Sequence, residues 1–346
     1  MNKFKAILQI TLLIVLSACS DSNDANRPYE VLFQGMTMGT VSYNVKVIIK
    51  PDTLLGSKFD QQQTHKDIDE ILQQLLQDMS NWEANSELTR FNKSTSLSQV
   101  TISEGLRRVL AESIRLGNLS EGKLDVTIGP LINLWGFGPE YRPEKVPTDI
   151  ELQTAQARTG LKYLTLDGNK LSKAIPDLYI DLSTIAKGYA VDLIAEYFES
   201  KGMHNYLVEI GGEMRLKGFK HTGELWHVAI EKPLTEERVV HQIIIPKDNA
   251  LATSGDYRKY FEANGQRFSH IIDPKSGKPI NHKLVSVTVI HPSSMTADGL
   301  STAMMLMGED KALAFAEKNE LAAYMIIKTD HGFVEQSTVK FMQYLK

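Results

Sequence analysis

Short strand patterns joined by short connections constrain the fold of this chain more than any other feature of its sequence. Parallel neighbours in a sheet need a crossover of roughly a dozen residues, so strands separated by tight turns must pair mainly antiparallel. The last two patterns flank Asp330-His-Gly332 and predict a hairpin. The expected strands are residues 43–49, 206–210, 226–231, 239–245, 268–272, 285–290, 322–328 and 333–339.

Apolar residues at helical spacing predict helices among these strands. Ile68 and Met79 end an apolar stripe that predicts a helix over residues 65–79, and a second helix is expected over residues 104–116. The chain shows no internal repeat. The mixture of helices and tightly connected strands therefore predicts an α+β fold with a largely antiparallel sheet and packed helices. Residues 138–147 are the best candidate for a loop between two lobes.

The N-terminus indicates the compartment. Two lysines precede an apolar run over residues 6–16. This run is shorter than a membrane-spanning helix and has the order of a secretory signal. It ends in Leu16-Ser-Ala-Cys19, which resembles the bacterial lipobox, and Cys19 is the only cysteine of the sequence. The expected ranges are a lipoprotein signal peptide over residues 1–18, a lipidated N-terminus and tether over 19–34, and one folded domain over 35–346.

Charge and length exclude some function classes. Removing the two lysines of the signal leaves 38 − 2 = 36 basic residues against 42 acidic ones. An acidic chain without a dense basic stripe is a poor partner for nucleic acid. With 346 residues and 42% hydrophobic content, the chain is long enough to bury the core of one large domain or of two interlocked lobes.

One motif, residues 181–192, combines a possible helix start with a lysine. Asp181 or Ser183 is expected to cap a helix whose first turn presents backbone N–H groups to an anion. Lys187 near that positive end opposes the helix dipole, so an anionic partner such as a phosphate would explain its position. The alternative is a lysine exposed to solvent.

A second motif, residues 296–302, is expected inside a helix that begins near Met295 and continues through Met307. Asp298 and Thr302 are four residues apart and share one face of that helix. A carboxylate and a hydroxyl on one face could both reach a hard cation such as Mg²⁺. The alternative is an ordinary helix surface.

Weaker candidates lie at the ends of the expected elements. The glycine pair Gly211-Gly212 allows either a close ligand approach or a turn. Ser254 and Gly255 could offer backbone N–H groups to a phosphate, or form a turn. His270 could transfer a proton, although a single histidine is more often structural. Met38 could contact a flat ring or lie in a tight turn. Trp82 could stack on a flat ring or pack in the core.

Several common enzyme classes lack their signatures in this sequence. It contains no G-x-x-x-x-G-K-[ST], no H-E-x-x-H, no G-x-G-x-x-G after a strand and no G-x-S-x-G. Ordinary P-loop, zincin, Rossmann and serine-hydrolase interpretations therefore lose support.

Taken together and in order, the motifs from residue 35 to residue 308 resemble the ApbE family of FAD:protein FMN transferases. The motifs are Met38-Gly-Thr40, Ser86-Glu-Leu-Thr-Arg-Phe-Asn92, residues 181–192, Glu209-Ile-Gly-Gly-Glu213, Thr253-Ser-Gly-Asp-Tyr257, His270-Ile-Ile-Asp-Pro274 and Thr296-Ala-Asp298. The resemblance implies an ApbE-type α+β fold with FAD between the lobes. It also implies Mg²⁺-dependent transfer of FMN from FAD to a threonine hydroxyl of a target protein, with release of AMP.

The resemblance also implies roles for individual residues. Mg²⁺ would be bound by the side chains of Asp298 and Thr302 and by the backbone carbonyl of Thr184. The acceptor hydroxyl must lose its proton, so His270 or a carboxylate such as Asp298 could assist as the base, and the sequence leaves this choice open. Lys187 and Ser254-Gly255 would contact the phosphates of FAD. The residues expected to line FAD are Met38, Trp82, Leu124, Asp125, Val126, Asp181, Lys187, Ser254, Gly255 and Ile272.

The resemblance leaves several alternatives open. Trp82 stands where relatives often carry tyrosine, and Gly299 stands where alanine is common. An FAD pyrophosphatase that releases FMN and AMP would need the same residues, and a flavin-binding lipoprotein would need no turnover. The implied partners are periplasmic domains of redox-pump subunits, reached from a lipid anchor in the bacterial cell envelope. Whether the inner or the outer membrane holds the anchor stays open, as does the oligomeric state.

Overall fold

The computed structural model describes residues 26–140, 145–233, 239–256, 260–263 and 266–346. The expected signal peptide and Cys19 lie outside these ranges. Within them, no helix combines the length and the apolar character needed to cross a membrane.

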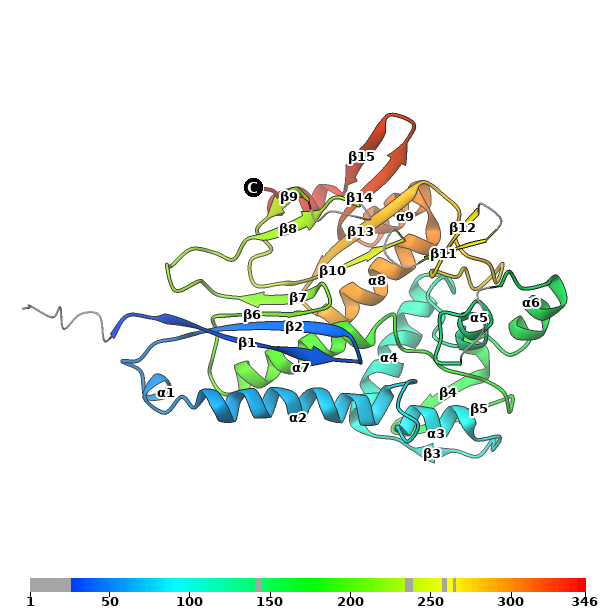
Figure 1. The fold of residues 1–346 in the computed structure, drawn as a ribbon, viewed down its shortest axis with the longest axis horizontal. Helices are drawn as coiled ribbons and strands as arrows, with labels where there is room; N and C mark the ends of the chain where they lie inside the picture. Colours follow the sequence, from blue (N-terminus) through cyan, green and yellow to red (C-terminus); the bar gives the residue numbers. More distant parts are fainter. Residues whose placement is uncertain (1–25, 141–144, 234–238, 257–259, 264–265) are drawn as a thin grey trace, which may run out of the picture.

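An antiparallel sheet organises the fold (Figure 1). Within the described residues it has eight strands in the order β1-β2-β6-β7-β10-β13-β14-β15, and each neighbouring pair runs antiparallel. The prediction of a largely antiparallel sheet is confirmed. The strands are β1 (Tyr29–Thr37), β2 (Val41–Ile49), β6 (Tyr206–Ile210), β7 (Glu213–Lys217), β10 (Ala250–Gly255), β13 (Leu284–His291), β14 (Ala322–Thr329) and β15 (Gly332–Ser337).

Both faces of the central strands β13 and β14 are buried, and their side chains alternate between two cores. In β14, Ala323 and Met325 belong to the main core, whereas Tyr324 and Ile326 belong to a second core on the opposite face. Nearly continuous burial along β14 follows from this two-sided packing.

Helices cover the main-core face of the sheet. In sequence order, α7 packs on β6 and β7, α8 packs on β10 and β13, and α9 packs on β14. Two further helices, α2 and α4, add a second layer, since α2 contacts α7 and α4 contacts α8 (Figure 1). The bounds are α2 (Gln61–Met79), α4 (Glu104–Leu119), α7 (Ala186–Ser200), α8 (Ser294–Met307) and α9 (Glu309–Lys318).

The opposite face is covered by a small hairpin and the C-terminal turn. Trp226, Ile230 and Ile244 of the hairpin region and Phe341 of the turn belong to the second core. The hairpin strands are β8 (Val228–Glu231) and β9 (Val240–Ile244), and the turn is the 3₁₀ helix η3 (Val339–Tyr344).

A third, smaller cluster forms a separate lobe. Leu131, Trp135, Phe261 and Ile272 are buried in it. Its elements are α5 (Gly129–Leu134), α6 (Asp149–Gln156), β11 (Tyr260–Ala263) and β12 (Gln266–Ser269). The remaining elements are α1 (Leu54–Ser57), α3 (Glu87–Lys93), β3 (Val100–Thr101), the 3₁₀ helix η2 (Leu161–Tyr163), β4 (Leu164–Asp167) and β5 (Lys170–Lys173).

The long helices confirm their predictions. Residues 65–79 form most of α2, which begins earlier because Asp60 caps it by accepting a hydrogen bond from Gln63 N at 2.9 Å. Residues 104–116 lie in α4, and residues 295–307 lie in α8. The C-terminal hairpin is confirmed as β14 and β15.

The N-terminal boundary of the folded domain requires a correction. The expected boundary at residue 35 falls inside β1, so residues 29–34 are part of the sheet rather than of a tether. The reason is their alternation: Val31 and Phe33 are buried against the main core, whereas Leu32 and Gln34 are exposed.

The strand expected over residues 268–272 is also corrected. The strand β12 ends at Ser269, and the Ile271 backbone N–H donates to Ser269 Oγ at 3.2 Å. This local hydrogen bond turns the chain at His270, after which Ile272 forms an isolated bridge with Pro279. Part of the expected interlobe loop, residues 141–144, lies outside the described residues, while 138–140 and 145–147 lie between α5 and α6.

Candidate active site

The turn before α7 differs from the expected cap. Asp181 Oδ1 accepts a hydrogen bond from Ser183 N at 2.8 Å, which closes a local turn. The N-cap of α7 is Ile185, and it makes no side-chain capping hydrogen bond. The prediction that Asp181 or Ser183 caps this helix is therefore wrong, because the turn is completed before the helix begins.

Lys187, in the first turn of α7, lies between two buried carboxylates. Its Nζ is 2.5 Å from Glu213 Oε1 and 4.0 Å from Asp298 Oδ1. The two carboxylate side chains are 3% and 4% exposed, whereas the lysine side chain is 28% exposed and so stays partly accessible. The anionic partner expected for Lys187 is, within the described residues, first of all Glu213.

The three charges shift one another's pKa. Burial raises the pKa of Asp298, against the opposing positive charge of Lys187. Burial likewise raises the pKa of Glu213. Burial would lower the pKa of Lys187, but the nearby charges of Asp298 and Glu213 outweigh it and raise that pKa. Lys187 is therefore an ammonium at neutral pH.

A glycine allows α7 and α8 to approach each other closely. A Cβ on Gly188 would lie 2.3 Å from the backbone oxygen of Ser294, so no side chain fits there. At this distance the Gly188 backbone N–H donates to Asp298 Oδ2 at 3.0 Å. The Asp298 carboxylate is therefore fixed by a backbone group of the neighbouring helix.

The glycine pair between β6 and β7 forms a turn. Ile210 pairs with Glu213, so the loop has two residues, and both glycines have positive φ, +60° at Gly211 and +106° at Gly212. Positive φ at both central positions is the type I′ hairpin geometry. Of the two interpretations left open by the sequence, the turn is correct, and it carries Glu213 to Lys187.

Hydroxyl groups surround the next turn of α8. Ser254 Oγ of β10 lies 2.8 Å from Ser301 Oγ and 3.0 Å from Thr302 Oγ1. Gly255 ends β10 and pairs with Ser286 of β13. On the other edge of β10, the described ladder with β7 includes only Ala250 and Leu251. The end of β10 thus meets α8 at Thr302.

These oxygen atoms fit a hard divalent cation. Asp298 and Thr302 are one turn apart in α8 and both are buried. Glu213 Oε2 is also buried and has no hydrogen-bond partner among the described residues. When both are ionised, Glu213 and Asp298 exceed the charge of the Lys187 ammonium by one, and a bound cation would offset that excess. No group of three His, Cys, Asp or Glu side chains within the described ranges could hold a metal, so hydroxyl and carbonyl ligands such as Thr302 and Thr184 would be needed.

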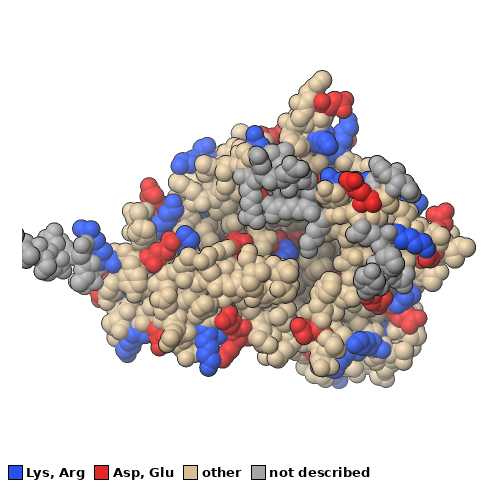
Figure 2. Space-filling view, in the orientation of Figure 1, with Lys and Arg blue, Asp and Glu red and all other residues tan. Residues whose placement is uncertain are grey.

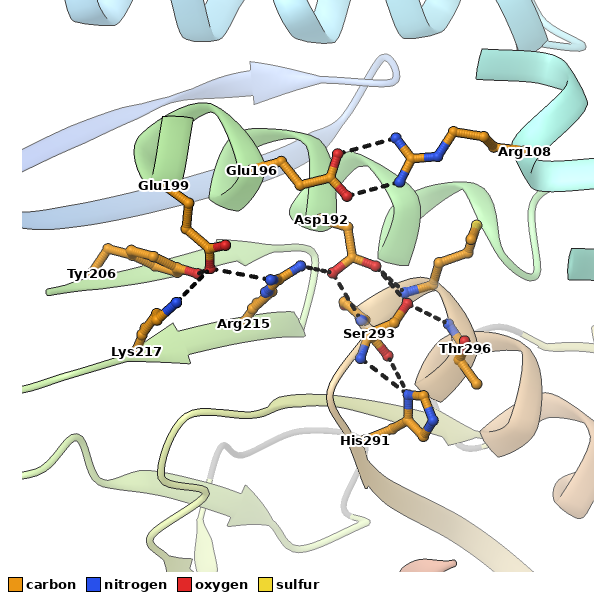
Figure 3. A network of polar contacts seen from close by, with 12 residues as sticks. Arg108, Asp192, Glu196, Glu199, Tyr206, Arg215, Lys217, His291, Ser293 and Thr296 are labelled. Carbon is orange, nitrogen blue, oxygen red and sulfur yellow. Dashed lines mark hydrogen bonds and ion pairs between the residues drawn. The ribbon is translucent and has the colours of Figure 1, made fainter. Parts of the chain in front are cut away.

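A polar network fixes the start of α8 against α7 and β7 (Figure 3). Asp192 of α7 accepts hydrogen bonds from Ser293 Oγ at 2.7 Å and from the backbone N–H groups of Ser294 and Met295 at 3.0 Å each. On its other side it accepts a hydrogen bond from Arg215 of β7 at 2.9 Å. Figure 3 shows this carboxylate between the helix start and the arginine. A carboxylate at a helix N-terminus stabilises both the unpaired N–H groups and the helix dipole.

Two hydrogen bonds connect the segments that carry three of the residues expected around the flavin, Trp82, Asp181 and Val126. Asn81, next to Trp82, donates to the Ile180 backbone oxygen at 3.2 Å. The adjacent Asp181 N donates to the Val126 backbone oxygen at 2.7 Å. The Trp82 side chain is 71% exposed, so the alternative of core packing is wrong for this ring.

The segment that contains Leu124 connects this region to both lobes. Leu124 and Val126 are buried in the main core, whereas Ile272 is buried in the smaller lobe. Lys123, next to Leu124, donates from Nζ to Oδ1 of Asp273, next to Ile272, at 2.9 Å. Asp125 Oδ1 accepts hydrogen bonds from the backbone and the hydroxyl of Thr127, and burial raises the pKa of Asp125. The expected site therefore spans the junction of the lobes.

Met38 lies in the β1–β2 turn with a positive φ of 49°. The turn leads into Val41, which lies close to Gly211. A Cβ placed on Gly211 would be 2.8 Å from Val41 Cγ1 and 3.6 Å from Lys187 Cδ. The hairpin tip is thus placed beside the start of α7. The face in Figure 2 is hollowed near its centre, and basic and acidic side chains of the described residues are interspersed over it.

His270 lies among aromatic residues of the smaller lobe. Its ring is 6.2 Å from that of Phe137, edge to face, in a group that also contains Trp135, Phe261 and Phe268. It follows β12, whereas Asp298 belongs to α8. The two expected catalytic residues thus come from different lobes.

Two residues of the site, Glu213 and Asp192, are not predicted from the sequence. Glu213 is only the last residue of the motif 209–213, and Asp192 is only the last residue of the motif 181–192. A lysine that opposes a helix dipole indicates a nearby anionic partner, but the sequence does not indicate which carboxylate it is.

Comparisons with known proteins agree with the geometry. The sequence model described as the ApbE family matches residues 38–325. A curated protein named FAD:protein FMN transferase from Vibrio cholerae serotype O1 is 49% identical over 339 residues, which cover 98% of this chain and 98% of that protein. A protein of the same name from Haemophilus influenzae is 49% identical over 341 residues, which cover 97% of this chain and 96% of that protein.

Solved structures share the fold. The structure titled flavin transferase ApbE from Vibrio cholerae has a TM-score of 0.85 at 50% identity and covers 92% of this chain and 100% of that chain. The apo form of the Pseudomonas stutzeri flavinyl transferase ApbE has a TM-score of 0.84 at 40% identity and covers 92% and 98% of the two chains. The sequence resemblance and the predicted fold class are confirmed, and the chain belongs to the ApbE family.

Proposed function

We propose that this chain is an FAD:protein FMN transferase that uses Mg²⁺ and a threonine hydroxyl as acceptor. The observation that carries the proposal is the convergence of Lys187, Asp298 and Thr302 where α7, α8 and β10 meet. A cationic side chain beside oxygen ligands for a metal suits a pyrophosphate substrate. The names of the relatives from Vibrio cholerae and Haemophilus influenzae support the same activity.

In this proposal, each residue handles one part of FAD. Lys187 contacts the pyrophosphate, and the end of β10 at Ser254-Gly255 presents its backbone to the phosphates. Trp82 offers an exposed ring on which the flavin can stack. Asp298, Thr302 and the Thr184 carbonyl hold Mg²⁺, which when bound offsets the negative charge of the pyrophosphate.

The proposed transfer is a substitution at phosphorus. The threonine oxygen of the target forms a bond to the phosphorus of the FMN half, the bond from that phosphorus to the bridging oxygen breaks, and AMP leaves. The threonine proton must pass to a base. Asp298 already accepts a hydrogen bond from Gly188 and serves as a metal ligand, so we assign the proton to His270.

Localisation and partners complete the proposal. The lipobox-like Leu16-Ser-Ala-Cys19 supports a lipid anchor at Cys19, with the folded domain facing the periplasm. The acceptors would be periplasmic domains of redox-pump subunits.

Product analysis tests the proposal against its alternatives. The mature chain is incubated with FAD, Mg²⁺ and a candidate acceptor domain, and the nucleotides are separated by chromatography while acceptor-bound flavin is followed by its fluorescence. Flavin on the acceptor in equal amount to AMP supports the transferase. Free FMN with AMP would indicate an FAD pyrophosphatase, and unchanged FAD with every acceptor offered would indicate a flavin-binding protein.

A further inference from the structure

We propose that Glu213 is a positioning residue that holds the Lys187 ammonium away from Asp298 and thereby keeps Asp298 available to a divalent cation. This inference rests on the metal site of the proposed function. It assigns a role to the buried carboxylate at the β6–β7 turn.

The positions of the three charges carry the argument. The Lys187 Nζ lies 2.5 Å from Glu213 Oε1 but 4.0 Å from Asp298 Oδ1. The ammonium is therefore in hydrogen-bond contact with only one of the two carboxylates. Without the Glu213 charge, Asp298 would be the buried anion nearest to Lys187, and a direct ion pair between them would block the metal ligand.

Backbone groups place Glu213 beside Lys187 and fix the Asp298 carboxylate independently of Lys187. Glu213 follows the two-residue turn of Gly211 and Gly212 and pairs in register with Ile210. Asp298 Oδ2 is held by the Gly188 backbone N–H at 3.0 Å. The lysine side chain is the longest of the three and is 28% exposed, so it has the most room to change partner. We therefore expect its choice of carboxylate to respond to the charges of Glu213 and Asp298.

Charge balance acts in the same direction. A divalent cation on Asp298 would lie close to the Lys187 ammonium, and the two positive charges repel each other. The Glu213 carboxylate compensates for that ammonium, and its second oxygen, Oε2, is buried with no partner among the described residues. Removal of the Glu213 charge should therefore weaken cation binding, whereas removal of the Lys187 charge should strengthen it.

Calorimetric titration of Mg²⁺ into the full chain without FAD measures the Mg²⁺ affinity directly. Glu213→Gln should weaken Mg²⁺ binding about tenfold or more, Lys187→Met should tighten it, and the double variant should return to within about threefold of wild type. A merely structural role of the ion pair would weaken Mg²⁺ binding in both single variants and would not allow recovery in the double variant.

Matched controls separate the possible failures. Glu196→Gln removes a carboxylate on α7 that pairs with Arg108 and should leave Mg²⁺ affinity unchanged. Asp298→Asn should abolish binding; if it binds like wild type, both the metal site and this inference are wrong. If Asp298→Asn abolishes binding but Glu213→Gln binds like wild type, only this inference is wrong. Should Glu213→Gln not fold, Lys187→Met decides the matter, because weaker Mg²⁺ binding by that variant would overturn the inference.

Discussion

The contact between α7 and α8 gives the most quantitative prediction. Gly188→Ala adds one methyl group at the closest point of the two helices. The new Cβ would lie 2.3 Å from the backbone oxygen of Ser294 and 2.8 Å from Met295 Cα. These are backbone atoms, so they cannot rotate away, and the helices would have to separate by about 1 Å to reach ordinary contact.

Two costs follow from that separation. Overpacking of this kind costs about 1–3 kcal/mol. The hydrogen bond from Gly188 N to Asp298 Oδ2, now 3.0 Å, would lengthen, and a hydrogen bond to a charged group contributes about 1.5–3 kcal/mol. Because the two costs partly share one displacement, we expect a loss of about 2–4 kcal/mol in the free energy of unfolding.

Urea unfolding followed by tryptophan fluorescence measures this loss, and FMN transfer by the variant should fall because Asp298 is displaced. Gly105→Ala in α4 is the matched control. Its Cβ would meet Asp78 Oδ2 at 2.8 Å, the end of a side chain that can rotate. The control should change stability by less than about 1 kcal/mol. A Gly188→Ala variant as stable and as active as wild type would refute the proposed role of this close approach.

Three further substitutions test the site. Asp192→Asn should lower the free energy of unfolding by about 2–4 kcal/mol, because the buried carboxylate holds the start of α8, whereas Glu196→Gln should cost less than about 1 kcal/mol; equal thermal shifts would contradict this. Thr302→Val should weaken Mg²⁺ binding about tenfold or more by calorimetry, whereas Ser301→Ala should stay within about threefold of wild type; the reverse order would exclude Thr302 as a ligand. His270→Asn should lower the transfer rate about 10²-fold or more without changing Mg²⁺ affinity, and an unchanged rate would remove His270 as the base.

Local sequence signals predicted the two helices of the site but not the strands β7 and β10, which carry Glu213 and Ser254. Apolar periodicity predicted α8 within one residue of its start, and with it the placement of Asp298 and Thr302 on adjacent turns. Short connections predicted the antiparallel sheet, and the glycine pair predicted a turn as one of two interpretations.

Long-range pairing could not be predicted in the same way. The partner of Lys187 depends on how β7 is placed against α7, and no local sequence pattern specifies that placement. The predicted cap of α7 was wrong because Asp181 forms a local turn with Ser183 before the helix begins. The first strand was missed at residues 29–34, since its alternation has meaning only once β2 lies beside it.

Metal-dependent transfer of FMN to a protein is tested most directly by the intact mass of an acceptor domain. The mass is measured after incubation with this chain, FAD and Mg²⁺, with and without a chelator. We expect a mass gain equal to one FMN that disappears with the chelator and when the acceptor threonine is replaced. A gain that persists in chelator would contradict the assigned metal site, and the absence of any gain while FAD is cleaved to FMN and AMP would contradict the transferase itself.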